Sequence, residues 1–256
     1  MIIMENYKKL ISINVTNGPY RRFLENIIIM SSRNISSYVC VANVHMLVEA
    51  YNNEAFASIV NNADLVTPDG MPLTWGLKLV HGIQQDRVAG MDLLPDLLTE
   101  ASKLQLPVYF YGGTQAMLDQ TDAYIRKVYP SLHVAGMYSP PFRPLTAEED
   151  QQIVDKINAS GARMIFVALG CPKQEKWMAS MKGRIQATMI GIGGALPVMV
   201  GMQKRAPEWM QKASLEWLYR LVQEPKRLFK RYAVTNTTYL WLLTRELFTK
   251  KRLKTT

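Results

Sequence analysis

The chain has 256 residues, 48% of them hydrophobic and 20% charged, a balance that supports a packed core and excludes global disorder. It contains no stretch of the roughly 18 uncharged apolar residues that a membrane span needs. The formal net charge of +9 lies in the last fifth of the chain: residues 203–256 hold thirteen Lys or Arg against four Asp or Glu, whereas residues 1–202 hold seventeen of each.

Apolar runs and helical patterns alternate along the first half of the chain. Strands are predicted at 10–16 ("LISINVT"), 36–43 ("SSYVCVAN") and 63–68 ("ADLVTP"), and helices at 19–30, 72–82 and 91–104. The last of these helices places six apolar side chains on one face, at the spacing of an amphipathic helix.

The second half continues the alternation. Strands are predicted at 107–113, 132–138, 163–170 and 187–194, with helices at 114–129, 147–157 and from Pro172 onward. Thr146 and Glu149 match a capping box at the start of the 147–157 helix, and Pro172 is expected at the first helical position. Two helices, at about 208–223 and 225–250, complete the basic tail.

Strands that alternate with helices predict an α/β fold of Rossmann-like type, a mostly parallel sheet with helices on both faces. The charge distribution predicts two parts, a core at 1–202 and a basic helical appendage at 203–256. The start, "MIIMENYKKL", lacks the pattern of a secretory signal, and Cys40 and Cys171 lie in apolar segments. We therefore expect two buried thiols in a reducing cytosol.

Polar or glycine-rich segments follow five of the predicted strands. In an open α/β sheet, ligands bind at the carboxyl ends of the strands, so these segments are expected to meet at one edge. The residues concerned are Asn43 and His45 in "ANVHM", Asp69 in "PDG", Gly112 and Gly113 in "YGGT", Gln174 in "GCPKQEKW", and Gly193 and Gly194 in "GIGG".

The segment "VTPDGMP" allows two interpretations of Asp69. Pro-Asp-Gly is typical of a tight turn, since proline presets φ, aspartate caps its own backbone and glycine supplies a positive φ. The same turn at the end of a strand would also present a carboxylate for catalysis. The local sequence favours the turn.

Two segments could bind phosphate. Gly112 and Gly113 either let the backbone approach a phosphate before a helix N-terminus or form an ordinary strand-to-helix turn. Neither G-x-G-x-x-G nor a P-loop pattern occurs. The helix that starts at Pro172 either offers N–H donors beside Gln174 and Lys176 or is a solvated helix with Trp177 as its core anchor.

No metal site is expected. The three histidines are widely separated, and the D-x-D motif that often holds a metal on a nucleotide diphosphate is missing. Phosphate charge would then be met by Arg, Lys or backbone donors.

The tail mixes bases with Trp, Tyr and Phe side chains. Such helices lie on anionic membrane surfaces, bind nucleic-acid backbones, or dock on their own domain with solvated lysines. Membrane binding is favoured, because the neutral body offers no basic groove for a nucleic acid.

Six segments occur in the order seen in the WecG/TagA/CpsF family of bacterial glycosyltransferases, which the chain resembles from about residue 41 to residue 231. They are "ANVHMLVEA", "NNADLVTPDGMPL", "DRVAGMDLLPDL", "VALGCPKQEKW", "GIGGALPVMVG" and "KRAPEWMQKASLEWLYRLVQEPKR". The resemblance implies an inverting, metal-independent transfer, with no cofactor, from a UDP-sugar to a sugar on a polyprenyl diphosphate. In teichoic acid and enterobacterial antigen members the donor is UDP-N-acetylmannosamine and the acceptor sugar N-acetylglucosamine; other members use different hexoses.

The resemblance also implies roles for residues. The family's proposed general base matches Asp69. Its substrate-binding positions match Asn43 and Gln174, and we extend substrate binding to His45, Arg87 of "RVAG", Gly112, Gly113, Gly193 and Gly194. Its appendage bases match Arg220, Arg227 and Lys230, which are expected to hold the acceptor diphosphate while the appendage meets the inner face of the cytoplasmic membrane.

Three departures from teichoic acid members favour an exopolysaccharide or capsule member. Val41 replaces a threonine, His45 stands where an acid is frequent, and Leu196-Pro197 replaces Phe-Asp. We expect a cytoplasmic protein peripherally bound to the membrane that does not bind nucleic acid, and the sequence leaves its oligomeric state open, a homo-oligomer included. Two other classes compete with this function, a nucleotide-binding oxidoreductase and a basic nucleic-acid-binding module.

Overall fold

The computed structural model describes residues 6–253, and its centre is a six-stranded sheet. The strand order is β4-β3-β8-β7-β5-β6, and all neighbouring strands pair in parallel. The strands are β3 (Ser37–Ala42), β4 (Leu65–Pro68), β5 (Val108–Gly112), β6 (Val134–Tyr138), β7 (Met164–Ala168) and β8 (Thr188–Gly191). The predicted Rossmann-like α/β fold is confirmed.

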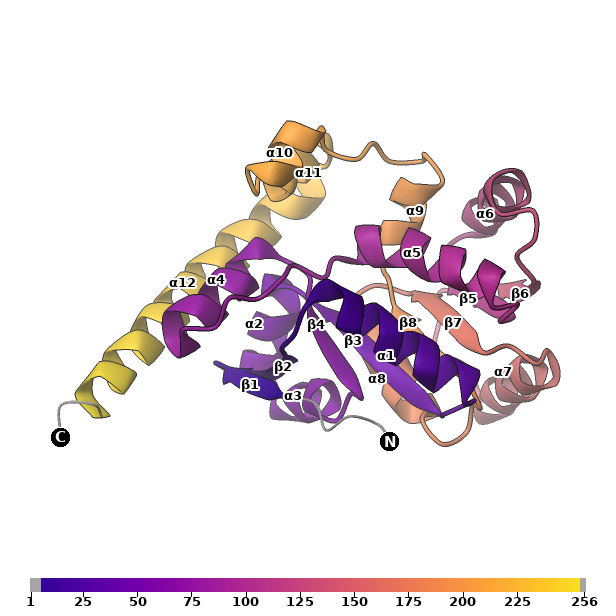
Figure 1. The fold of residues 1–256 in the computed structure, drawn as a ribbon, viewed down its shortest axis with the longest axis horizontal. Coiled ribbons are helices and arrows are strands. Elements are labelled where there is room, and N and C mark those ends of the chain that lie inside the picture. Colours follow the sequence, from indigo (N-terminus) through magenta and orange to yellow (C-terminus); the bar gives the residue numbers. More distant parts are fainter. Residues whose placement is uncertain (1–5, 254–256) are drawn as a thin grey trace.

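Helices cover both faces of the sheet (Figure 1). One face packs against α1 (Tyr20–Ser32), α5 (Gly90–Lys103), α6 (Gln115–Val128) and α9 (Ala195–Met199). The other packs against α2 (Val44–Asn52), α3 (Glu54–Asn61), α4 (Met71–His81), α7 (Ala147–Ala159) and α8 (Lys173–Met181). Alternate side chains of each strand enter the two cores, which is why the central strands are apolar throughout.

Several helix starts follow from local sequence. The Thr146 side chain accepts a hydrogen bond from the Glu149 N–H, and Glu149 accepts one from the Thr146 N–H, so the predicted capping box is confirmed. Asn43 and Thr114 cap α2 and α6. Pro172 occupies the position before α8, after a cis peptide bond, rather than the predicted first helical position. The sequence analysis does not predict α2, α3 or α9.

The N-terminal segment departs from its prediction. Residues 10–16 were expected as one strand, but the chain forms a hairpin of β1 (Tyr7–Leu10) and β2 (Ile13–Thr16), paired antiparallel outside the main sheet. Ile11 has φ = 58°, so the chain reverses there. The apolar alternation on both sides of this turn resembles a single strand in sequence.

The basic tail forms three helices where two were predicted. They are α10 (Glu208–Lys212), α11 (Glu216–Gln223) and α12 (Pro225–Leu253). Ser214, with φ = 62°, breaks the expected 208–223 helix, and the Leu215 N–H donates to the Met210 carbonyl. This turn lets α11 lie beyond the carboxyl edge of the sheet instead of continuing α10.

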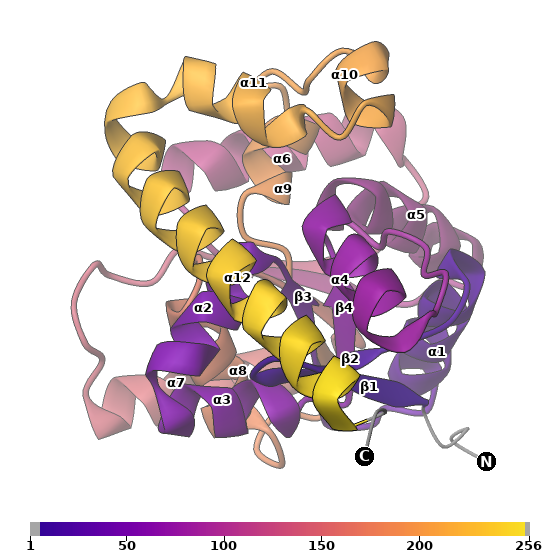
Figure 2. The same ribbon diagram turned by 90° about the vertical axis from the view of Figure 1, so that its left-hand side faces the viewer.

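Helix α12 runs along one side of the molecule, across α2, α4 and the hairpin (Figure 2). Tyr239 and Leu243 are buried in the same core as Leu10 and Leu77. The Tyr239 hydroxyl donates to the Pro72 carbonyl at 2.5 Å, and the Ile11 N–H donates to Glu246 at 3.0 Å. The appendage is therefore docked on the core, while the division between 202 and 203 stays a prediction.

Candidate active site

The carboxyl ends of the parallel strands form one edge of the sheet, and the predicted site residues lie along it. Asn43 and Asp69 directly follow β3 and β4, which are neighbours, and Gly193 and Gly194 closely follow β8, on the other side of β3. Gln174 is reached from β7. Helix α11 of the appendage meets this edge, where Glu216 binds Arg87 and Arg220 lies against Gly194.

Asp69 lies at the junction of β4 and α4. Its N–H donates to the Ala42 carbonyl at 2.8 Å, and its carboxylate accepts a hydrogen bond from the Gly90 N–H at 3.2 Å. Gly70 has φ = −104° and caps α4. The expectation that this glycine supplies a positive φ in a tight turn is wrong, because the segment is a strand-to-helix connection.

The surroundings of Asp69 raise the pKa of its carboxylate into a range that suits a general base. Burial raises the pKa of Asp69 to about 6, and the positive charges of Arg87 and Arg220 oppose that rise. The Gly90 hydrogen bond also lowers this pKa, whereas the negative charge of Glu216 raises it. A carboxylate of this pKa is ionised at neutral pH and can still accept a proton.

Arg87 is held beside Asp69 by the backbone of its own loop. The Val88 N–H donates to the Pro68 carbonyl at 2.9 Å, and the Thr67 hydroxyl donates to the Val88 carbonyl at 3.0 Å. The loop between α4 and α5 is thereby fixed to the end of β4.

Arg87 belongs to a ring of four charged side chains. The Arg87 guanidinium donates to Asp92 at 2.9 Å and also to Glu216. Arg205 donates to the other oxygen of Asp92, and its Nε lies 3.8 Å from Glu216. Two members come from the core and two from the appendage, so the ring joins the two parts next to Asp69. The sequence analysis missed Asp92, Arg205 and Glu216, and their only signal is an ordinary charge pattern.

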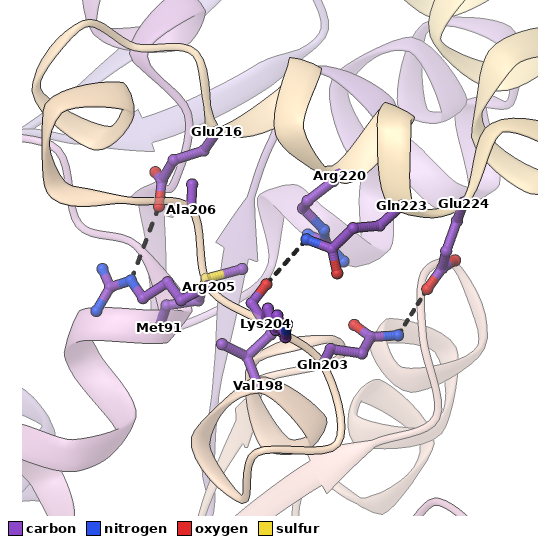
Figure 3. A pocket seen from close by; sticks show the side chains of 10 residues that line it. All are labelled: Met91, Val198, Gln203, Lys204, Arg205, Ala206, Glu216, Arg220, Gln223 and Glu224. Atoms are coloured by element: carbon purple, nitrogen blue, oxygen red, sulfur yellow. Dashed lines mark hydrogen bonds and ion pairs between the residues drawn. The ribbon is translucent and has the colours of Figure 1, made fainter.

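Arg220 reaches the end of β8. A Cβ atom on Gly194 would lie 2.8 Å from a terminal nitrogen of Arg220, so the guanidinium rests directly on this glycine. Glu216 and Arg220 stand one turn apart on α11 and both line a small hollow between the appendage and the core (Figure 3). Of the three predicted appendage bases, Arg220 is the one at Asp69.

The other two appendage bases lie elsewhere. Arg227 is exposed and pairs with Glu224 of the appendage itself, and Lys230 is exposed on α12. The break between α11 and α12 separates Arg220 from the other two, and their role at the acceptor diphosphate stays a prediction.

Gln174 is almost fully buried, with 4% of its surface exposed. Its amide oxygen accepts from the Gly170 N–H at 3.2 Å, and its amide nitrogen donates to Glu175 at 2.7 Å. The side chain lies against Gly191 and Gly193, where a Cβ at Gly191 would come within 2.9 Å of it. Gln174 therefore packs against the glycine segment that follows β8. Burial raises the pKa of its neighbour Glu175.

Asn43 and His45 lie at the start of α2. The side-chain carbonyl oxygen of Asn43 accepts a hydrogen bond from the Met46 N–H at 3.2 Å and so caps the helix. Burial and the nearby charge of Arg231 lower the pKa of His45, which is therefore neutral at pH 7. Arg231, on α12, is a second appendage base near the edge that the sequence analysis did not assign to the site.

Gly112 and Gly113 lie far from Asp69 along the edge. Four strand spacings separate β5 from β4, a distance of about 19 Å. Gly112 has φ = 109°, and a Cβ there would lie 2.8 Å from the Ala168 backbone, so contact with β7 already requires a glycine. The structure thus favours the ordinary-turn interpretation at this point.

The structure describes no cluster of three or more metal-ligating side chains within residues 6–253. In the same range, no helix combines the length and apolarity of a membrane span. Trp177 stacks on Tyr111 with ring centroids 4.0 Å apart, as expected for a core anchor of α8.

The chain is similar to known proteins over most of its length. Residues 8–253 match the family model described as glycosyl transferase WecG/TagA/CpsF. A curated protein of Bacillus spizizenii, N-acetylglucosaminyldiphosphoundecaprenol N-acetyl-beta-D-mannosaminyltransferase, is 33% identical over 196 residues. That alignment covers 76% of this chain and 74% of the relative.

Proposed function

Because the chain belongs to the glycosyl transferase WecG/TagA/CpsF family, we propose that it transfers a hexose from a UDP-sugar to a sugar carried on a polyprenyl diphosphate. The chain is a glycosyltransferase, so the oxidoreductase and the nucleic-acid-binding module no longer compete. The observation that carries the proposal is the Asp69 carboxylate, with its pKa near 6, beside the guanidinium groups of Arg87 and Arg220.

In the proposed mechanism Asp69 is the general base. It accepts the proton of an acceptor hydroxyl while that oxygen attacks the anomeric carbon of the donor. The bond from that carbon to the UDP oxygen breaks in the same displacement, which inverts the carbon and releases UDP. A positioned base of this type contributes about 10²–10⁴-fold to the rate.

Negative charge develops on the leaving diphosphate and is already present on the acceptor lipid. Arg87 and Arg220 stand next to Asp69 and can pair with phosphate oxygens there. Arg227 and Lys230 are exposed farther along the appendage, where they suit a lipid diphosphate arriving from a membrane. We propose that these cations, together with backbone N–H groups at Gly193 and Gly194, replace a metal ion.

The surface of α11 supports contact with a membrane. Its polar side chains Glu216 and Arg220 face the core, whereas Trp217 and Val222 are 44% and 72% exposed. An amphipathic helix with an outward apolar face and nearby Lys and Arg side chains fits the interface of an anionic bilayer. We propose that the appendage rests on the inner face of the cytoplasmic membrane and brings the lipid-linked acceptor to Asp69.

The donor sugar is N-acetylmannosamine, glucose or a similar hexose. The Bacillus spizizenii relative is named for N-acetylmannosamine transfer. His45 and Val41 lie at the edge near Asp69 and differ from the teichoic acid pattern, which supports an exopolysaccharide or capsule pathway with another hexose.

The test is a screen of UDP-sugars for UDP release in the presence of N-acetylglucosaminyl-diphosphate-undecaprenol in detergent. One donor should give acceptor-dependent UDP release, and turnover should fall as pH falls through about 6 because Asp69 becomes protonated. Asp69→Asn should lower turnover by at least about 100-fold, while calorimetry should find UDP binding largely unchanged.

The matched control is Asp155→Asn, which neutralises a carboxylate on α7, on one face of the sheet, and should leave turnover as in the wild type. Near-normal turnover of Asp69→Asn would rule out its role as the base. Absence of acceptor-dependent UDP release with any donor would rule out the proposed reaction.

A further inference from the structure

Helix α11 carries Arg220 to the active site with little apolar packing to hold it there. Within α11, all of which the structure describes, no residue is buried. Its side chains Trp217, Leu218 and Val222 are exposed, and Trp217 contacts Tyr232 of α12 edge to face, with ring centroids 6.3 Å apart. The position of Arg220 over Gly194 must therefore depend on the polar contacts of the helix.

Glu216 makes the polar contact that joins α11 to Arg87, beside Asp69. Its carboxylate accepts from Arg87 of the core and lies 3.8 Å from Nε of Arg205. Its side chain is 18% exposed and that of Arg87 is 19% exposed, so solvent screens this pair less than a surface ion pair. Since Arg87 and Arg220 both act on Asp69, Glu216 connects the two cations of the site.

The other acidic side chains of the appendage with described contacts do not reach this point. Glu224 accepts from Gln203 and pairs with Arg227, both within the appendage. Glu246 accepts from the Ile11 N–H on the N-terminal hairpin. Glu216 alone among these three contacts a core residue beside Asp69.

We infer that Glu216 is a positioning residue, which fixes α11 on the core through Arg87 and Arg205 and so holds Arg87 and Arg220 at the Asp69 carboxylate. The inference rests on the proposed function, because the site that it orders is the one assigned there to glycosyl transfer. Glu216 would touch neither the acceptor nor the donor, and turnover would still depend on it.

The mechanism predicts different effects on binding and on turnover. Without the Glu216 charge, Arg87 and Arg220 keep their attraction for a diphosphate, so UDP binding does not weaken. Arg87 keeps Asp92 as a partner, but Arg220 loses its fixed position, and a misplacement of about 1 Å in a catalytic site can lower the rate about 100-fold. A residue needed only for folding would instead lower binding and thermal stability together.

The experiment compares Glu216→Gln, Arg205→Gln and the double variant in the UDP-release assay. Glu216→Gln keeps the shape of the side chain and removes its charge. We expect each single variant to lower kcat by about 10- to 100-fold, with UDP affinity within about threefold of the wild type by calorimetry. Because both residues act through one ring, the double variant should be no slower than about the slower single variant.

Glu148→Gln, which neutralises an exposed carboxylate on α7, serves as the control and should match the wild type. The inference is overturned if Glu216→Gln keeps kcat within about twofold of the wild type. It is also overturned if the activity of Glu216→Gln falls because UDP binds more weakly, or if the effects of the two single variants multiply in the double variant. Asp69→Asn in the same assay separates the two proposals. An active Asp69→Asn overturns the base assignment, whereas an inactive Asp69→Asn with a fully active Glu216→Gln overturns only the positioning role.

Discussion

Asp69 experiences opposing influences that leave its carboxylate close to the range where a base is effective. Burial favours its protonated form, while Arg87, Arg220 and the Gly90 N–H favour its ionised form. Burial is the larger effect, so the pKa is raised to about 6 even though two guanidinium groups stand nearby. The folded state therefore holds an ionised carboxylate at neutral pH at some cost in stability.

That cost predicts a pH-dependent stability of Asp69→Asn. The folded-state pKa of Asp69 lies above its ordinary value of 3.8, so stability is lost as pH rises from about 4 to about 6 and the loss is complete above that. An asparagine side chain resembles the protonated form of aspartate, so Asp69→Asn does not lose stability as pH rises. Asp69→Asn should be more stable than the wild type by up to about 2–3 kcal/mol at pH 8, with the difference vanishing near pH 4.

Urea denaturation at pH 4 and pH 8 would measure this difference. The control Asp155→Asn should show no comparable gain at pH 8. Equal stability of Asp69→Asn and the wild type at pH 8 would contradict the raised pKa.

At the scale of elements, α12 is anchored to α4 through one close contact. A Cβ atom on Gly76 would lie 2.5 Å from the Tyr239 hydroxyl oxygen and 3.1 Å from the methyl groups of Leu10. The glycine thus allows α12 and the hairpin to approach α4 together. Tyr239 uses the space to donate a hydrogen bond to the Pro72 carbonyl.

Gly76→Ala should therefore loosen α12. We expect a loss of about 1–3 kcal/mol in the free energy of unfolding, the usual cost of overpacking a core. Tyr239→Phe removes the nearest atom that the new methyl group would meet. The double variant Gly76→Ala/Tyr239→Phe should then be more stable than the sum of the single effects predicts.

Thermal and urea unfolding of the three variants would measure this coupling. Additive effects in the double variant would mean that the Tyr239 hydroxyl does not limit the approach of α12 to Gly76.

For the whole molecule, the positive charge lies on the appendage together with exposed aromatic side chains such as Trp217 and Phe229, while the charges of residues 1–202 balance. The predicted division into a core at 1–202 and an appendage at 203–256 implies that a chain cut near residue 202 would keep a folded body. The structure argues against a clean cut, because Tyr239 and Leu243 belong to the core and their removal would uncover Leu77. Point changes on the exposed surface separate membrane binding from folding more clearly.

Trp217→Ser/Val222→Ser should weaken binding to vesicles that contain anionic phospholipid. Both side chains are exposed, so the change should affect folding little. Loss of two apolar groups that would otherwise enter the bilayer interface should lower the vesicle partition coefficient by about tenfold or more. Co-sedimentation with vesicles is the measurement.

The matched control is Phe142→Ser, which removes an aromatic side chain that is 89% exposed on the loop between β6 and α7 of the core. It should bind vesicles as the wild type does. Equal binding by Trp217→Ser/Val222→Ser and the wild type would show that α11 is not the membrane-facing helix.

Sequence patterns predicted much of the architecture for a local reason. Buried parallel strands such as β7 are continuous apolar runs, and the start of α7 is set by a hydrogen-bond pair between residues three apart. The same patterns failed at Ile11 and Ser214, where non-glycine residues adopt a positive φ that these residue types rarely take. Helices α2, α3 and α9 were missed because they are short, with 9, 8 and 5 residues, and so few turns leave the helical period hard to recognise.

The sequence by itself determined the parallel α/β fold, the position of Asp69 after a strand, and the basic appendage, because periodicity, strand-end residues and charge are properties of the chain. Only the tertiary structure decided which of these residues meet. It brought Arg87, Glu216 and Arg220 to Asp69, left Arg227 and Lys230 on the exposed surface, and separated Gly112 by about 19 Å along the edge. The physical reason is that strand order and helix breaks set distances between residues, and neither is encoded in the spacing of residues along the chain.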